Sequence, residues 1–254
     1  MNIIVPIKQV PDLVEELEIA ASGKELNREW LKFKINEFDD HALEEALCIK
    51  EAQGATVTVI ALDGEDIDKV LFAAAAKEAD KLVKVTGAGE SPSSHEAAKA
   101  LAGVIGGMAF DLILTGVQAA DDRDGQLGVL LAHYLGLPHV SVVTGVTLAG
   151  TTATVHKEYG GGVTAEFDVS LPAVLGIQAA RQTPRYVPVA RVRQAMRSAT
   201  IEEVSCSAGG VTAGTGINRM FKPESGGGAQ MLEGTANDVA AKIIGIIREK
   251  GIKI

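Results

Sequence analysis

Short apolar segments alternate with segments of helical spacing along the first half of the chain. The apolar segments, each of strand length, are residues 2–7, 56–62, 81–85 and 111–115. The helical segments, which place apolar side chains on one face, are residues 36–51, 66–78 and 93–107, and a fourth starts at Gly125. This alternation predicts an α/β fold with a right-handed, doubly wound, mostly parallel sheet.

The pattern changes after Pro138. Alternating apolar and polar residues, separated by glycines, predict an antiparallel meander at 139–148, 151–158 and 163–169, followed by an apolar strand at 172–178. Residues 13–35 are mixed and predict an excursion or a ribbon. From residue 198 apolar density falls, glycines gather at 209–216 and 226–228, and a last helix is expected near 235–249. We therefore expect an α/β domain at 1–198 and a C-terminal arm at 199–254 that wraps around another molecule.

The candidate site is the loop at 116–124, which joins the strand at 111–115 to the following helix. In an open α/β sheet such a turn lies at the carboxyl edge, where a helix N-terminus offers unpaired N–H groups to an anion. This loop is therefore where we expect a phosphate, unless it is an ordinary turn with solvated aspartates. The first strand is followed by Lys8–Asp12 and not by a Gly-x-Gly-x-x-Gly motif, which disfavours a conventional NAD-binding domain.

Composition and charge exclude several classes of function. The chain has 254 residues with 46% hydrophobic and only 4% aromatic residues, which suits helices packed on a parallel sheet. The net charge of −9 argues against a nucleic-acid surface. No apolar run reaches the roughly 18 residues of a membrane span, so we expect a cytoplasmic protein with no direct membrane insertion. Two cysteines and five scattered histidines predict neither a disulfide framework nor a metal site.

A set of short motifs resembles the beta subunit of electron transfer flavoproteins over the whole chain. The motifs are Ile4–Lys8, Asn36–Asp39, Ala42–Ala46, Gly116–Asp122, Gln126–Gly128, Gly161–Gly162, Leu171–Val174, Pro184–Tyr186, Asp238–Lys242 and Gly251–Ile254. Their order and spacing carry the resemblance, since each motif alone is weak. The resemblance implies a Rossmann-like fold of the adenine-nucleotide-binding type.

It also implies a function. Members of that family pair with an alpha subunit that holds most of a redox-active FAD, while the beta subunit clamps this FAD and binds AMP. They carry electrons from dehydrogenases, often the acyl-CoA dehydrogenases of fatty acid oxidation, to a quinone reductase or another acceptor. One branch holds a second FAD in place of AMP and oxidises NADH. The resemblance implies an electron carrier subunit in which the flavin, and no catalytic side chain of this chain, performs the redox chemistry.

The resemblance assigns the nucleotide contacts to strand ends and to the loop. The residues are Pro6, Asn36, Glu37, Phe38, Asp39, Asp63, Ala119, Ala120, Asp121, Asp122, Arg123, Asp124, Gly125, Gln126, Leu127 and Gly128. Because like charges repel, we assign Asp121 and Asp122 to capping, loop hydrogen bonds or a ribose hydroxyl, with solvated loop charges as the alternative. Glu37 and Leu127 depart from the family pattern of a proline and a hydroxyl-bearing residue. The missing hydroxyl at Leu127 removes one phosphate contact and keeps a second FAD possible.

Residues 178–193 align with the loop that docks a leucine into the partner dehydrogenase of the family. The matching residue is Val189, accompanied by Tyr186 and by Arg185, Arg191 and Arg193. An exposed apolar anchor ringed by cations suits an acidic partner, whereas an ordinary loop would turn Val189 inward. An alternative of a different class is an adenine-nucleotide-sensing module related to universal stress proteins, with no redox role.

Overall fold

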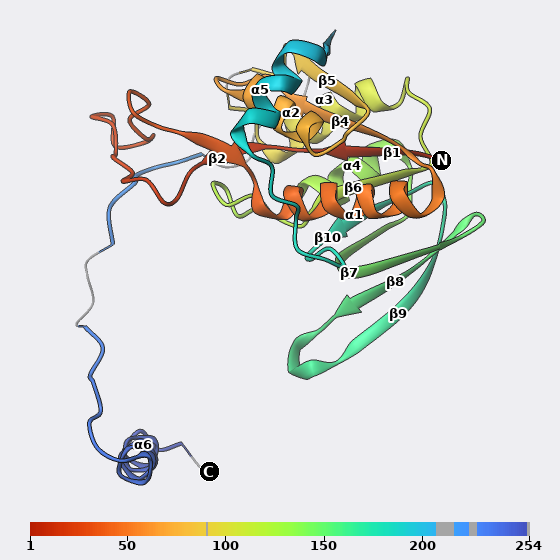
Figure 1. The fold of residues 1–254 in the computed structure, drawn as a ribbon. Coiled ribbons are helices and arrows are strands. Elements are labelled where there is room, and N and C mark those ends of the chain that lie inside the picture. Colours follow the sequence, from red (N-terminus) through yellow and green to blue (C-terminus); the bar gives the residue numbers. More distant parts are fainter. Residues whose placement is uncertain (90, 207–215, 224–227, 253–254) are drawn as a thin grey trace.

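The computed structural model describes residues 1–89, 91–206, 216–223 and 228–252. Its main sheet has nine strands in the order β11-β5-β4-β1-β6-β10-β7-β8-β9 (Figure 1). The strands are β1 (Asn2–Pro6), β4 (Thr56–Leu62), β5 (Lys81–Thr86), β6 (Leu112–Gly116), β7 (His139–Ala149), β8 (Thr152–Glu158), β9 (Thr164–Ser170), β10 (Ala173–Ile177) and β11 (Ile201–Ser205). All pairings are parallel except those of β7 with β8 and β8 with β9. The predicted mostly parallel sheet with an antiparallel extension is confirmed.

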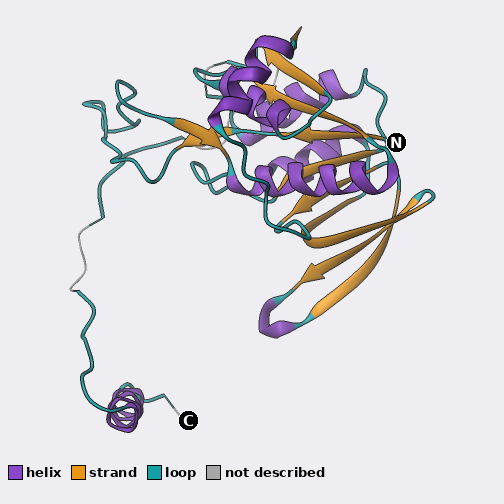
Figure 2. Ribbon diagram, in the orientation of Figure 1, coloured by secondary structure: helices purple, strands orange, loops and turns teal. Residues whose placement is uncertain are grey.

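Helices cover both faces of the sheet (Figure 2). One face carries α1 (Glu37–Gln53) and α2 (Ile67–Ala76), with α5 (Val189–Ser198) packed against α2. The other face carries α3 (Ser94–Ile105) and α4 (Leu127–Leu135). The core is aliphatic on both faces, because strand residues point alternately up and down: Leu114 of β6 packs toward α1, and its neighbour Ile113 packs toward α4.

Strand β7 changes partners along its length. Its first residues pair in parallel with β10, and from Val143 onward it pairs antiparallel with β8. The change occurs at an irregularity in β7. Gly176 of β10 pairs with Ser141 and Ile177 pairs with Val143, so Val142 has no partner in β10, and Val142 has a φ of 65. A β-branched residue in the left-handed region is strained. The strand thereby leaves the parallel sheet and starts the meander that β8 and β9 complete.

The excursion after β1 is a ribbon, as predicted. Strands β2 (Gln9–Pro11) and β3 (Phe33–Ile35) pair antiparallel, and a single bridge joins Ile19 to Leu26 beyond them. The C-terminal arm touches this ribbon, because the Met220 backbone N–H donates to the Gly23 carbonyl at 2.7 Å. The ribbon is thus connected to a segment about two hundred positions later in the chain.

The predicted arm begins with an element that the sequence analysis did not anticipate. Residues 201–205 form β11, which pairs in parallel with β5 at the edge of the sheet. The last helix is α6 (Ala236–Glu249), which starts at a Thr235–Asp238 capping box and lies apart from the sheet (Figure 1). None of its residues, all of which the structure describes, is buried. The glycine-rich residues 209–215 and 226–227 and the motif residues Lys253 and Ile254 lie outside the described residues. The wrapping of a partner by the arm stays a prediction.

Candidate functional site

The sheet has a topological switch point beside β1. From β1 the chain winds outward through β4 and β5, and then returns to build β6 and β10 on the other side. In open α/β sheets a crevice forms at such a point, outside the carboxyl ends of the strands. Three predicted site residues or segments lie at this edge: Pro6 ends β1, Asp63 follows β4, and the loop at 117–126 follows β6. The topology therefore brings together residues that are more than one hundred positions apart.

The start of α1 joins the ends of β1 and β6. The Asp39 carboxylate accepts a hydrogen bond from the Lys8 backbone N–H at 2.8 Å and another from the Gly116 backbone N–H at 3.1 Å. Burial raises the pKa of the Asp39 carboxyl to about 7, against the lowering effect of the N–H groups and of the Asn36 side chain. Asp39 thus uses its side chain to hold the two strand ends together, and its predicted nucleotide contact stays a prediction.

Asn36 holds the loop in the same way. Its amide nitrogen donates to the Gln118 carbonyl at 2.8 Å, and its amide oxygen accepts from the Ala120 N–H at 3.2 Å. Although Asn36 occupies the N-cap position of α1, its side chain makes no capping bond within the described part of the chain. Its neighbours in the predicted site differ from it, since Glu37 is exposed and Phe38 is half-buried. Asn36 therefore shapes the loop that follows β6.

Only glycine fits at position 116. A Cβ placed on Gly116 would lie 2.8 Å from the backbone nitrogen of Asp39 and 2.8 Å from the carbonyl carbon of Phe38. These are backbone atoms of the first turn of α1, which cannot rotate away as a side chain can. Because Gly116 has no side chain, the first turn of α1 can pack directly against the end of β6.

Lys8 forms ion pairs with two aspartates of the loop. Its Nζ lies 2.8 Å from Asp121 Oδ1 and 2.7 Å from Asp122 Oδ2. Although desolvation of Lys8 opposes it, the two carboxylates raise the pKa of this lysine. Asp122 also accepts from the Asp124 N–H at 2.9 Å, and a loop hydrogen bond is one of the roles considered for this aspartate. Both aspartates are therefore ion-paired with the same lysine, whose single positive charge offsets one of their two negative charges.

The backbone of the same loop turns sharply before α4. Arg123 and Gly125 have φ values of 56 and 65, and the Gln118 side chain donates to the Arg123 carbonyl at 2.6 Å. Ala119 is half-buried, whereas Ala120, Arg123 and Asp124 are exposed. A hydrogen bond within the loop thus holds its two ends together, and the loop leads directly into α4.

The N-terminus of α4 has no protein cap. Gln126 makes no side-chain capping bond within the described residues and no acidic residue stands in the first turn, whereas α3 begins with a capping box of Ser93 and Glu96. Gln126 is exposed, Leu127 is half-buried and Gly128 is buried. N–H groups left without a cap at a helix start are suited to an anion, which also gains from the helix dipole. The predicted contact of a nucleotide phosphate with the amides of residues 125–128 stays a prediction.

A buried polar atom lies beneath this helix start. Thr115 Oγ1 has no hydrogen-bond partner among the residues that the structure describes. A Cβ on Gly128 would lie 2.8 Å from this oxygen and 3.2 Å from Nε2 of His139. Gly128 therefore lets the first turn of α4 approach β6 and β7 closely. Sequence reasoning missed Thr115, although a hydroxyl at the carboxyl end of an apolar strand was a visible signal.

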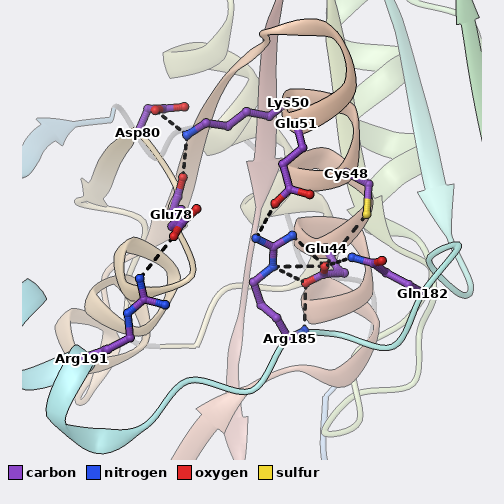
Figure 3. Close-up of polar contacts among 9 residues, drawn as sticks. All are labelled: Glu44, Cys48, Lys50, Glu51, Glu78, Asp80, Gln182, Arg185 and Arg191. Atoms are coloured by element: carbon purple, nitrogen blue, oxygen red, sulfur yellow. Dashed lines mark hydrogen bonds and ion pairs between the residues drawn. The ribbon is translucent and has the colours of Figure 1, made fainter.

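The predicted docking segment is displayed on the surface. Tyr186 is 84% exposed and Val189, the first residue of α5, is 63% exposed, so Val189 does not pack inward. The arginines around it are partly engaged: Arg185 pairs with Glu44 and Glu51, and Arg191 pairs with Glu78 at 3.2 Å. Arg193 is exposed. Val189 is thus exposed, its role as an anchor stays a prediction, and Arg185 ties the segment to α1 (Figure 3).

The sequence matches one protein family over most of its length. A family model described as "Electron transfer flavoprotein domain" matches residues 25–208. The chain is also 36% identical to "Electron transfer flavoprotein subunit beta" of Methylophilus methylotrophus, with 98% of each chain covered. The chain belongs to the beta-subunit family of electron transfer flavoproteins. Membership implies flavin-based electron transfer and an alpha subunit as partner.

Two further relatives show the range of this beta-subunit family. The chain is 29% identical to "Electron transfer flavoprotein subunit beta" of Clostridium acetobutylicum, over 98% of this chain and 99% of the relative. It is 32% identical to "Caffeyl-CoA reductase-Etf complex subunit CarD" of Acetobacterium woodii, over 99% of this chain and 100% of the relative. These similarities extend through the C-terminal arm.

Two further features of the described residues concern metal binding and membrane insertion. Among the described residues, no group of three or more His, Cys, Asp and Glu side chains could bind a metal ion. No helix in the described part of the chain is long and apolar enough to cross a bilayer.

Sequence reasoning also missed Glu44 and Glu45, which are buried in α1. Their signal was two carboxylates directly beside the core-facing residues Leu43 and Ala46.

Proposed function

We propose that this chain, together with its alpha subunit, carries electrons from dehydrogenases to a quinone reductase or a similar acceptor in the cytoplasm. Acyl-CoA dehydrogenases of fatty acid oxidation are the proposed donors. The FAD held mainly by the alpha subunit supplies the redox chemistry, and this chain clamps it. The observation that carries the nucleotide part of the proposal is the uncapped start of α4 at the switch point of the sheet.

In this proposal the chain holds AMP at the carboxyl edge of β1, β4 and β6. The backbone N–H groups of residues 125–128 receive the phosphate, because the helix start has neither a cap nor an acidic residue. Lys8 supports this by pairing with Asp121 and Asp122, because it offsets one of their two negative charges and so reduces their repulsion of an anion. Pro6 and Asp63 lie at the same edge of the sheet, at the ends of β1 and β4. Asp63 is exposed there, so its carboxylate is accessible to a ribose hydroxyl.

The docking segment supports the proposed electron donor. Tyr186 and Val189 form an exposed apolar surface close to the cations Arg191 and Arg193, on a chain whose net charge is −9. Aromatic and apolar anchors surrounded by charge are typical of transient interfaces, where charge sets the encounter rate and the anchor sets affinity. An acidic dehydrogenase surface with an apolar pocket fits this arrangement.

A second candidate function is a bifurcating subunit that binds a second FAD and oxidises NADH. Leu127 favours it, because an aliphatic side chain at the first residue of α4 contributes no hydroxyl to a phosphate. The relative of Acetobacterium woodii, named as a subunit of a caffeyl-CoA reductase-Etf complex, supports keeping this second candidate. The match to the electron transfer flavoprotein family disfavours the stress-protein-like alternative.

One measurement separates these functions. The chain is co-expressed with the alpha subunit of the same organism, the complex is purified and denatured, and released FAD and AMP are quantified by chromatography. One FAD and one AMP per complex would support the proposed carrier. Two FAD and no AMP would support the bifurcating function, with NADH then tested as donor. One FAD and no AMP would contradict the proposed AMP site and leave this chain with clamping and docking alone.

A further inference from the structure

Helix α1 contains two adjacent carboxylates that are buried and that both bind the docking segment. Glu44 is 0% exposed and Glu45 is 1% exposed. Glu45 accepts from the Arg181 backbone N–H at 3.0 Å and from the Arg181 guanidinium at 2.6 Å. One turn earlier in the helix, His41 Nδ1 accepts from the Ala180 N–H at 3.2 Å. Residues 180 and 181 therefore run along α1, tied by backbone and side-chain bonds.

Glu44 makes the denser set of bonds. Its carboxylate accepts from the Arg185 backbone N–H at 2.9 Å, from Arg185 Nε at 3.0 Å and from Arg185 Nη2 at 2.9 Å (Figure 3). It also accepts from the Gln182 side chain at 2.7 Å. Although burial opposes its ionisation, the Arg185 side chain and backbone N–H lower the pKa of Glu44. A buried carboxylate is stable only when such partners surround it, so Glu44 fixes both the backbone and the side chain of Arg185.

This anchor lies immediately beside the exposed part of the segment. Tyr186 follows Arg185 directly, and Val189 begins α5 three residues later. On the far side, Arg191 of α5 pairs with Glu78, whose carbonyl accepts from Lys50 of α1 at 2.7 Å (Figure 3). The exposed residues are thus held between two tethers, and the buried tether at Glu44 is the stronger because water does not compete for it.

We propose that Glu44 is a positioning residue for docking of the electron donor: it holds residues 182–185 so that Tyr186 and Val189 are presented in a fixed geometry. The inference rests on the proposed function of this segment. Glu44 does not touch the partner, because it is buried under Arg185. Its effect is preorganisation, since a segment already ordered before binding loses less conformational entropy when the complex forms.

The test compares Glu44→Gln with Glu51→Gln in the complex with the alpha subunit. Both variants remove one carboxylate from the same helix and from the same arginine, but Glu51 is exposed and bonds only the Nη1 atom of Arg185. Hydrogen exchange of residues 180–189 reports the order of the segment. Steady-state kinetics with an acyl-CoA dehydrogenase, reduced by its own acyl-CoA, reports the KM for the complex and kcat.

Glu44→Gln is expected to speed exchange of the Arg185 amide about tenfold or more and to raise KM about threefold to tenfold. The FAD content and kcat stay unchanged, because the flavin site is not altered. Glu51→Gln is expected to leave exchange and KM within about twofold of the wild type. A purely structural role would lower thermal stability without moving KM below the melting range.

A normal KM in Glu44→Gln despite faster exchange would overturn the inference and leave the proposed function standing. If no acyl-CoA dehydrogenase reduces even the wild-type complex, the proposed function fails and the inference fails with it. Should Glu44→Gln not fold, Arg185→Lys takes its place, because it keeps a cation beside Glu44 and removes the forked hydrogen bonds of the guanidinium. The same increases in exchange and KM are then expected, and their absence would again overturn the inference.

Discussion

Gly116→Ala is the sharpest test of how the site is built. The added methyl group would stand 2.8 Å from the Asp39 nitrogen and from the Phe38 carbonyl carbon, and ordinary contacts begin near 3.4 Å. The first turn of α1 would have to move away from β6 by the difference, about 0.6 Å. This movement also pulls Asp39 from the backbone N–H groups of Lys8 and Gly116. Gly116→Ala therefore disturbs both the packing of α1 on β6 and the hydrogen bonds of Asp39.

The expected loss of stability is about 3 kcal/mol. Overpacking at a rigid contact costs typically about 1–3 kcal/mol, and each weakened hydrogen bond adds roughly 0.5–1.5 kcal/mol. In a chain of this size a loss of 3 kcal/mol lowers Tm by about 6–12 °C. Because the loop at 117–126 is held by the same turn of α1, we also expect the complex to retain less nucleotide.

Thermal unfolding of the purified complex with the alpha subunit measures the effect, and released nucleotide is quantified in the same samples. Gly103→Ala is the matched control, because Gly103 lies in α3 with open space around its Cβ position. Alanine is the better helix former, so this control should gain roughly 0.5–1 kcal/mol. A Gly116→Ala complex that melts within about 1 °C of the wild type would refute the reasoning.

Three further predictions concern Asp39, Leu127 and Val189. Because burial raises the pKa of Asp39 to about 7, above its value of 3.8 in the unfolded chain, its ionisation costs stability as pH rises. Urea denaturation should show the unfolding free energy of the wild type falling, relative to Asp39→Asn, by about 1.4 kcal/mol per pH unit from about pH 5 to 7; equal slopes would contradict this. Leu127→Thr should increase AMP retention about fivefold through one added hydrogen bond, whereas Leu127→Val, which lacks the hydroxyl, should not; chromatography of released AMP checks both. Val189→Asp should raise KM for the donor dehydrogenase about tenfold or more at unchanged FAD content, because a charge would enter an apolar pocket, and an unchanged KM would remove Val189 from the docking surface.

The regular elements were predictable because their signal is local. Strand β4 occupies the predicted residues 56–62, and the meander of β7, β8 and β9 lies within a residue or two of its predicted bounds. Alternation and helical spacing record which side of each element is buried, and that record survives in the sequence. Strand β11 was missed because Glu202 and Glu203 break the apolar pattern. At the edge of a sheet such residues face solvent, so a strand there need not look buried.

The sequence predicted where the candidate site lies in the chain, but it did not predict which residues contact one another there. The loop at 116–124 and the docking segment were both identified, from a strand-helix junction and from motif order. The roles of their charged residues were not, because each depends on a partner far away in the chain. Lys8 meets Asp121 across 113 positions, and Arg185 meets Glu44 across 141.

The amino-acid sequence by itself determined most of the elements, the sheet class and the family, because burial imposes a short-range pattern and the family motifs keep their order. Only the tertiary structure decided which charges are neutralised and which are free. Asp121 and Asp122 became an ion-paired part of the loop, Arg185 became an anchor, and Thr115 became a buried hydroxyl without a partner among the described residues. The physical reason is that an ion pair or a close contact depends on distance in space, and the packing of α1 and α4 on the sheet sets that distance.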